Sequence, residues 1–201
     1  MRITLKNLSV IKKKKILNKL NIDIPSGKFV SIVGPNGSGK TTLLKSIAGL
    51  TSFKGQILFN KINSNARGKK KIAYIPQNMI IPEGMTLAEY VMLGRIAHLG
   101  WLKVEKLKDY NIVVDSLKKV DLIDFSKKLL STLSGGEMQR AIIARTLAQE
   151  ADILILDEPT AFMDFARSAE VIKILNDFRL EKNLTILMSS HDINNLLSYS
   201  D

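Results

Sequence analysis

Short apolar runs alternate with helical patterns along the chain and predict a mixed α/β fold. Residues 28–33 form one apolar, β-branched run, and residues 153–156 are four consecutive branched aliphatic residues, as in strands buried on both faces. Residues 184–188 repeat this pattern after a helical stretch over residues 165–180. Alternation of strands and helices favours a parallel sheet with right-handed crossovers, in which ligands bind at the carboxyl ends of the strands.

Two regions depart from this alternation. Residues 2–10 and 20–24 alternate polar and apolar positions, which indicates an antiparallel part near the N-terminus. From residue 78 to about 130 apolar residues recur at helical spacing, first after the N-cap candidate Thr86. We therefore predict a single domain over residues 1–201, with an α/β core over residues 1–77 and 131–201 and a helical subdomain over residues 78–130.

The turn after the first apolar strand carries phosphate-binding chemistry. Residues 34–42 fit the pattern G-x-x-x-x-G-K-[ST] between a strand and a helix. The glycines let consecutive N–H groups point at an anion, and the helix N-terminus adds partial positive charge. Lys40 is expected to reach the outer phosphates and Thr41 to ligate Mg²⁺. The nucleotide-binding residues predicted here are Gly34, Pro35, Asn36, Gly37, Ser38, Gly39, Lys40, Thr41 and Thr42.

Two adjacent carboxylates, Asp157 and Glu158, directly follow the strand at residues 153–156. A carboxylate at the end of a buried strand, beside a phosphate loop, is placed to hold Mg²⁺, and its neighbour to polarise a water. We assign the metal to Asp157 and the water to Glu158. The alternative is a pair of acids that caps a helix.

A second possible phosphate cradle precedes the helix at residues 141–148. Ser134, Gly135 and Gly136 offer backbone N–H groups at a helix N-terminus. One nucleotide does not need two cradles from the same molecule. The second cradle is therefore expected to close on a nucleotide held by a partner.

These motifs, in this order, resemble the ATP-binding subunits of ABC transporters over essentially the whole chain. The resemblance implies the ABC ATPase fold, a P-loop NTPase core with a helical subdomain, and ATP and Mg²⁺ as cofactors. It implies that Gln77 contacts Mg²⁺ and the attacking water, and that His191 reaches the γ-phosphate. The catalytic residues it implies are Glu158, His191 and Gln77, the metal-binding residues are Thr41, Gln77 and Asp157, and the further nucleotide-binding residues are Ser134, Gly135, Gly136 and Asp164.

The same resemblance implies partners and a location. Two copies would form a head-to-tail homodimer that holds two ATP molecules, each between residues 34–42 of one subunit and the Ser134 cradle of the other. The homodimer would sit on transmembrane permease subunits at the cytoplasmic face of the cell membrane, and work indirectly with an extracytoplasmic substrate-binding protein. The groove for the permease is expected within residues 78–100, with Met79, Ile80, Ile81 and Met85 as its apolar lining.

Finer resemblance concerns the substrate. Residues 86–95 and 98–101 are similar to importers of iron-siderophores, haem and vitamin B12, and we expect uptake of such a substrate. Zinc and manganese importers share much of residues 94–101 and are the alternative. A DNA-repair ATPase is a more distant alternative, since those proteins usually insert a long coiled coil, whereas Lys40 and Ser134 are 94 positions apart with no heptad repeat between them.

Composition changes this picture little. The chain carries 30 Lys and Arg against 19 Asp and Glu, a net charge of +11 that suits an anionic membrane surface, polyphosphate or nucleic acid. The lysine runs at residues 12–15 and 69–71 lack interleaved aromatics, and we expect no nucleic-acid partner. The absence of cysteine excludes disulfides and zinc–thiolate sites. No signal-peptide pattern or membrane-spanning apolar run is present, which predicts a soluble protein.

Two features depart from the family. An aromatic residue shortly before the second strand usually stacks on adenine, and residues 9–13 contain none. We expect Ile11 or the stem of Lys12 to pack on the base instead. The chain also ends at Asp201, about one helix after His191, whereas family members usually continue with further strands and a helix, so it is either a short form or truncated.

Overall fold

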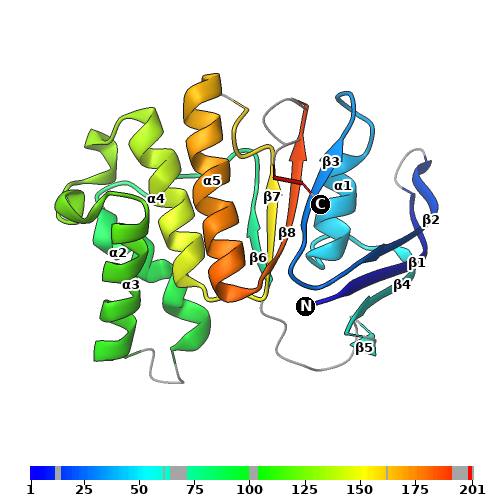
Figure 1. Cartoon of the computed structure of the whole chain (residues 1–201), viewed down its shortest axis with the longest axis horizontal. Helices are drawn as coiled ribbons and strands as arrows, with labels where there is room; N and C mark the ends of the chain where they lie inside the picture. The colour runs from blue at the N-terminus through cyan, green and yellow to red at the C-terminus, as the bar shows by residue number, and fades with distance from the viewer. Residues whose placement is uncertain are drawn as a thin grey trace. The chain divides into compact units, whose positions relative to one another are not determined.

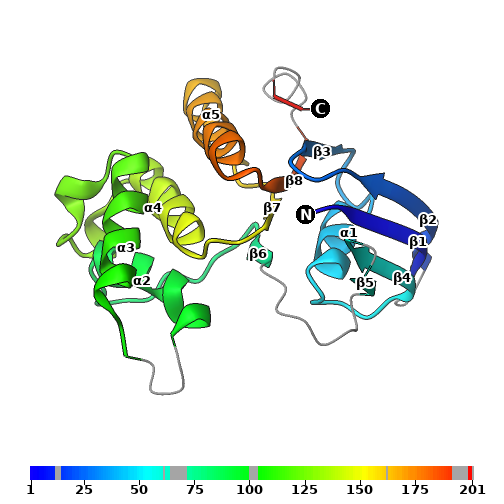
Figure 2. The ribbon, with the colours of Figure 1, turned by 60° about the horizontal axis from the view of Figure 1, so that its bottom comes forward.

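The computed structural model divides into two compact units, which are described separately (Figures 1 and 2). The first unit comprises residues 1–77 and 152–201, and the second comprises residues 78–151. The structure describes residues 1–11, 15–60, 62–63, 72–99, 104–161, 163–191 and 199–200.

The first unit contains an antiparallel sheet in the order β2-β1-β4-β5. Its strands are β1 (Ile3–Ile11), β2 (Lys15–Ile24), β4 (Lys54–Phe59) and β5 (Ile62–Asn63). In β1 the alternating apolar residues Ile3, Leu5, Leu8 and Val10 are buried. This confirms the antiparallel N-terminal part predicted from the alternation of polar and apolar residues.

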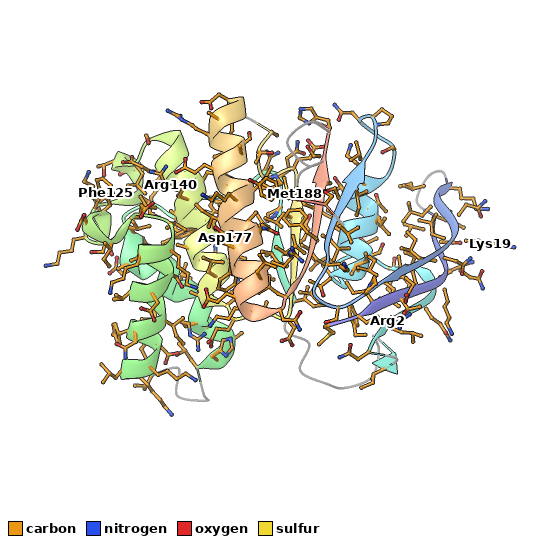
Figure 3. All side chains as sticks on the ribbon, in the orientation of Figure 1. Arg2, Lys19, Phe125, Arg140, Asp177 and Met188 are labelled. Atoms are coloured by element: carbon orange, nitrogen blue, oxygen red, sulfur yellow. The ribbon has the colours of Figure 1, made fainter. Side chains whose placement is uncertain are left out.

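The same unit contains a parallel sheet in the order β3-β8-β7-β6. Its strands are β3 (Phe29–Val33), β6 (Ile72–Ile75), β7 (Ile153–Asp157) and β8 (Thr185–Ser190). Every residue of β7 and β8 is buried, as their continuous apolar runs predict. Met188, labelled in Figure 3, lies within this sheet and is fully buried. The mixed α/β class with a mainly parallel core is therefore confirmed.

Helix α1 (Lys40–Ile47) joins the core of the two sheets. Its residues Leu43, Leu44 and Ile47 belong to one buried cluster with side chains of β1, β2, β4, β7 and β8. Figures 1 and 2 both show α1 beside the antiparallel strands. Helix α5 (Phe165–Lys182) belongs to the same unit, and its Arg179 donates a hydrogen bond of 2.6 Å to the carbonyl of Gly27.

The second unit is helical. It contains α2 (Leu87–Met92), α3 (Leu107–Lys119) and α4 (Gly135–Ala148), and the short 3₁₀ segments Leu93–His98, Ile123–Phe125 and Leu130–Thr132. Each of the three α-helices packs on the other two. Residues 131–151 thus lie with the helices rather than in the α/β core to which the sequence analysis assigned them. The apolar positions of α4 face α2 and α3 and draw it into this unit.

A buried arginine ties the parts of the helical unit together. Arg95 Nε donates to Asp109 Oδ1 at 2.9 Å, and Nη1 donates to the carbonyl of Ala148 at 2.7 Å and to Glu150 Oε2 at 2.9 Å. The hydrogen bond from the backbone N–H of Lys106 is the main reason why the pKa of Asp109 lies below its usual value, and the hydrogen bond from Arg95 is the second. The charge of Arg95 is therefore compensated where it is buried. None of the helices in the described part of the chain has the length and apolarity needed to cross a membrane.

Candidate nucleotide-binding site

The predicted site residues of the first unit meet at one edge of the parallel sheet. The strands run in the same direction, so their carboxyl ends share that edge. β3 leads into the loop at residues 34–39, β6 leads to Gln77, β7 ends at Asp157, and β8 leads to His191. The order of strands β3-β8-β7-β6 thus brings together residues that are up to 157 positions apart in the sequence.

The loop between β3 and α1 has the backbone that a phosphate cradle requires. Gly37 and Gly39 have φ angles of +79° and +99°, which side chains rarely tolerate. A Cβ atom on Gly39 would also lie 3.2 Å from Ile16 of β2, so this glycine permits both the turn and the close approach of the strand. Lys40 is 7% exposed, and its Nζ donates to the carbonyls of Gly34 at 2.7 Å and Pro35 at 3.2 Å.

This loop forms the wall of an open pocket of about 570 Å³. A pocket of this size accommodates a nucleotide. Its lining residues are Lys15, Ile16, Asn36, Gly37, Ser38, Gly39, Lys40, Thr41, Thr42, Gln77 and Glu158.

Three hydroxyl groups converge on the carboxylate of Asp157, which is 1% exposed. Thr41 Oγ1 and Ser189 Oγ donate to its Oδ1 at 3.0 and 2.8 Å, and Tyr74 Oη donates to its Oδ2 at 3.2 Å. Burial, and then the negative charge of Asp157, raise the pKa of Tyr74, which keeps the phenol protonated as a donor. The carboxylate and the Thr41 hydroxyl are hard oxygen donors of the kind that suits Mg²⁺.

The carboxylate of Glu158 points into the same pocket. Its Oε1 lies 3.4 Å from Lys40 Nζ, and its Oε2 accepts from Gln77 Nε2 at 3.1 Å and lies 3.7 Å from His191 Nδ1. The side chain of Glu158 is 11% exposed and that of His191 is 56% exposed. The structure thus brings Lys40, Gln77 and His191 together around Glu158.

Ile16 is a lining residue that the sequence analysis missed. Of the two residues expected to pack on the base, Ile11 is 58% exposed and is not among the lining residues, and Lys12 lies outside the described residues. β1 and β2 pair with register shifts that set Val10 opposite Leu17 and Ile11 opposite Lys15. The start of β2, rather than the end of β1, therefore borders the loop. A strand pattern that begins at residue 15 rather than 20 would have indicated this.

The second predicted cradle belongs to the helical unit. Ser134 caps α4, and its Oγ accepts from the N–H of Glu137 at 3.3 Å, while Glu137 Oε2 accepts from the N–H of Ser134 at 2.7 Å. The pKa of Glu137 is lowered mainly by the hydrogen bond that its carboxylate accepts from the backbone N–H of Ser134, and then by the Ser134 side chain. A Cβ atom on Gly135 would meet nothing within 4 Å, and Gly136 lies in the first turn. In the first unit, Asp164 caps α5 by accepting from the N–H of Arg167 at 2.9 Å.

The helical unit has a groove of its own, with a volume of about 640 Å³. Met85, Met92, Ile96 and Val113 are among its apolar lining residues, and Glu89 and Glu105 are among its acidic ones. Of the four residues expected to line such a groove, Met85 does so. Ile80 is 94% exposed, and Met79 accepts a hydrogen bond from the buried Tyr90.

Comparison with known proteins agrees with this geometry. A family model described as ABC transporter matches residues 17–161. A petrobactin import ATP-binding protein of Bacillus anthracis is 38% identical over 191 residues, which cover 92% of this chain and 70% of that protein. A manganese transport system ATP-binding protein of Listeria innocua is 39% identical over 206 residues, which cover 99% of this chain and 84% of that protein.

A solved structure titled as the dimeric structure of a bacterial ABC transporter cassette superposes with a TM-score of 0.84 at 28% identity, over 98% of this chain and 91% of that one. The family model spans more than half of the chain, and both relatives share more than a third of their aligned residues with it. The chain therefore belongs to the ABC transporter family, as an ATP-binding cassette.

Proposed function

We propose that the chain is the ATP-hydrolysing subunit of an ABC importer and that the pocket at residues 34–42 binds the nucleotide. The position of Glu158 carries this proposal. Its carboxylate is largely shielded from solvent and lies within 3.4 Å of Lys40, in the pocket that the phosphate loop lines. A carboxylate held there can accept a proton from a water that attacks the terminal phosphate.

The residues around Glu158 have separate tasks in this mechanism. Lys40 exchanges its bonds with the loop carbonyls for bonds with the β- and γ-phosphates, which have more negative charge. Glu158 orients the water. Gln77 and His191, which both approach Glu158, contact the water and the γ-phosphate and stabilise the charge that develops there.

The donor set at Asp157 fits Mg²⁺. Asp157 and the Thr41 hydroxyl would hold the ion, with Gln77 close to it. When bound, Mg²⁺ neutralises charge on the β- and γ-phosphates and so favours departure of the leaving group. The hydroxyls of Tyr74 and Ser189 keep the carboxylate oriented through their hydrogen bonds.

We place the complete site between two copies of the chain. The loop at residues 34–42 supplies one wall, and Ser134, Gly135 and Gly136 of a second copy supply the other, with Asp164 near the contact. Two observations support this: the second cradle belongs to a different unit from the loop, and a cassette of the family has been solved as a dimer. Binding of ATP would close the homodimer and hydrolysis would open it.

The chain would act at the cytoplasmic face of the membrane, bound to permease subunits, with a substrate-binding protein outside. The groove of the helical unit is the proposed seat of a permease helix, because Met85, Ile96 and Val113 give it an apolar lining. The relatives are named for petrobactin and for manganese, so we propose an iron-siderophore type of substrate, with manganese as the alternative.

Glu158→Gln tests the proposal. The amide keeps the size of the side chain but cannot take a proton, so ATP should still bind while the turnover number falls by about 10²-fold or more. The mass in solution, measured with ATP and Mg²⁺, should double as the closed homodimer accumulates. Equal activity of wild type and variant would exclude Glu158 as the base, and a monomer with bound ATP would exclude closure by the isolated chain.

Glu170→Gln is a matched control. Glu170 is an exposed residue of α5 outside the pocket, so the same loss of charge there should change neither turnover nor mass.

A further inference from the structure

The hydroxyl of Ser189 contacts two neighbouring residues of the proposed site. It donates to Asp157 Oδ1 at 2.8 Å and accepts from the backbone N–H of Glu158 at 3.0 Å. Ser189 is fully buried near the end of β8, and the strand register sets it directly opposite Asp157. One buried side chain thus links the strand that leads to His191 with both acidic residues.

The backbone of Glu158 needs such support. Its φ angle is +49°, in the left-handed region that residues other than glycine seldom adopt. Strained backbone of this kind persists where surrounding contacts enforce it. The turn directs the Glu158 carboxylate back to Lys40, Gln77 and His191. The N–H of Glu158 is also a donor that would lose its partner if the Ser189 hydroxyl were absent.

We propose that Ser189 is a positioning residue for Glu158. Its hydroxyl fixes the left-handed turn through the N–H bond, and its bond to the buried Asp157 fixes the hydroxyl itself. The hydroxyl touches neither the water nor the phosphate, and acts through Glu158. This inference rests on the proposed role of Glu158 as the residue that orients the water.

The structure offers two comparisons that isolate this bond. The hydroxyl of Tyr74 also donates a hydrogen bond to Asp157, but it makes no hydrogen bond with Glu158. Tyr74→Phe therefore removes a support of the Asp157 carboxylate alone. Ser116 is a buried serine of the helical unit that donates to the carbonyl of Ile112 at 2.7 Å. Ser116→Ala therefore removes a buried serine hydroxyl far along the chain from either acidic residue.

The first measurement is hydrogen exchange of the Glu158 amide in the nucleotide-free protein. Ser189→Ala should speed this exchange by about tenfold, since the amide loses its buried acceptor. Tyr74→Phe and Ser116→Ala should leave it unchanged. Equal exchange in Ser189→Ala and wild type overturns the proposal, and so does equal acceleration by Tyr74→Phe.

The second measurement separates kcat from KM for ATP. Ser189→Ala should lower kcat by about tenfold with KM within about twofold, because the water is misoriented while the phosphate loop is intact. Ser189→Thr keeps the hydroxyl and should restore kcat, and Ser116→Ala should keep it. A loss in KM with kcat unchanged overturns the positioning role. If Glu158→Gln itself retains full turnover, the proposed function fails instead, and the amide-exchange result still reports on the contact.

Discussion

At the scale of single residues, Ile16 gives the pocket an aliphatic lining where the family resemblance implied an aromatic ring. It lines the pocket beside Gly39, and no aromatic side chain is among the described lining residues. An aliphatic contact buries one face of a base but reads none of its hydrogen-bonding edge. We therefore expect ATP and GTP to bind with dissociation constants within about fivefold of each other.

Ile16→Ala should weaken ATP binding by about threefold to tenfold, because a buried aliphatic contact with the base is lost. Calorimetric titration of the wild type and the variant with ATP, and of the wild type with GTP, measures these dissociation constants. Ile11→Ala is the matched control: Ile11 lies on the neighbouring strand but is 58% exposed and outside the lining, so its loss should leave binding unchanged. If Ile11→Ala weakened ATP binding and Ile16→Ala did not, the base would contact the end of β1 instead of Ile16.

The sequence predicts the residues that bear motifs and misses those that support them. Lys40, Asp157 and Glu158 are recognisable because their chemistry requires fixed residue types at fixed spacings. Tyr74 and Ser189 carry no such signature: their contacts with Asp157 arise because β6 and β8 pair with β7 in one particular register. Register between distant strands depends on tertiary packing, which local patterns do not encode.

At the scale of elements, capping decides where the helices begin. The capping box of Thr86 and Glu89 starts α2 as the sequence predicts. Helix α4 starts at Gly135, six residues before the predicted start at residue 141, because the box formed by Ser134 and Glu137 initiates the helix. The apolar pattern alone marked only the part of α4 that packs on α2 and α3.

The groove of the helical unit yields a prediction at this scale. Ile96 lines it and is 52% exposed, so Ile96→Glu should fold normally and yet place a charge in an apolar docking surface. We expect the variant to lose co-purification with the membrane subunits of the transporter, while the ATPase activity of the isolated chain stays within about twofold.

The control for this prediction is Leu180→Glu. Leu180 lies in α5 of the other unit and is 64% exposed, so the same change of charge occurs outside the groove. It should keep the membrane subunits bound. Retention by Ile96→Glu as well would show that the permease docks elsewhere.

At the scale of the whole molecule, the two proposed phosphate cradles are divided between the two units. The loop at residues 34–42 belongs to the first, and Ser134, Gly135 and Gly136 belong to the second. From the sequence, the helical subdomain is expected to end at residue 130, which groups residues 131–151 with the α/β core, whereas α4 packs on the other helices and belongs to the helical unit. The segment therefore packs with the helices of its own chain, while we propose that Ser134, Gly135 and Gly136 bind a nucleotide held by a second copy.

Complementation between two inactive variants tests whether the site is shared. Lys40→Ala disables the loop, and Gly135→Asp places a negative charge in the second cradle, where a Cβ meets nothing within 4 Å and the fold is preserved. Each variant alone should be inactive. In a mixed head-to-tail dimer, one site combines both changes and the other has neither, so an equal mixture should recover about a quarter of the wild-type ATPase activity. A site built within one chain leaves every mixture inactive, since each copy then contains one of the two defects.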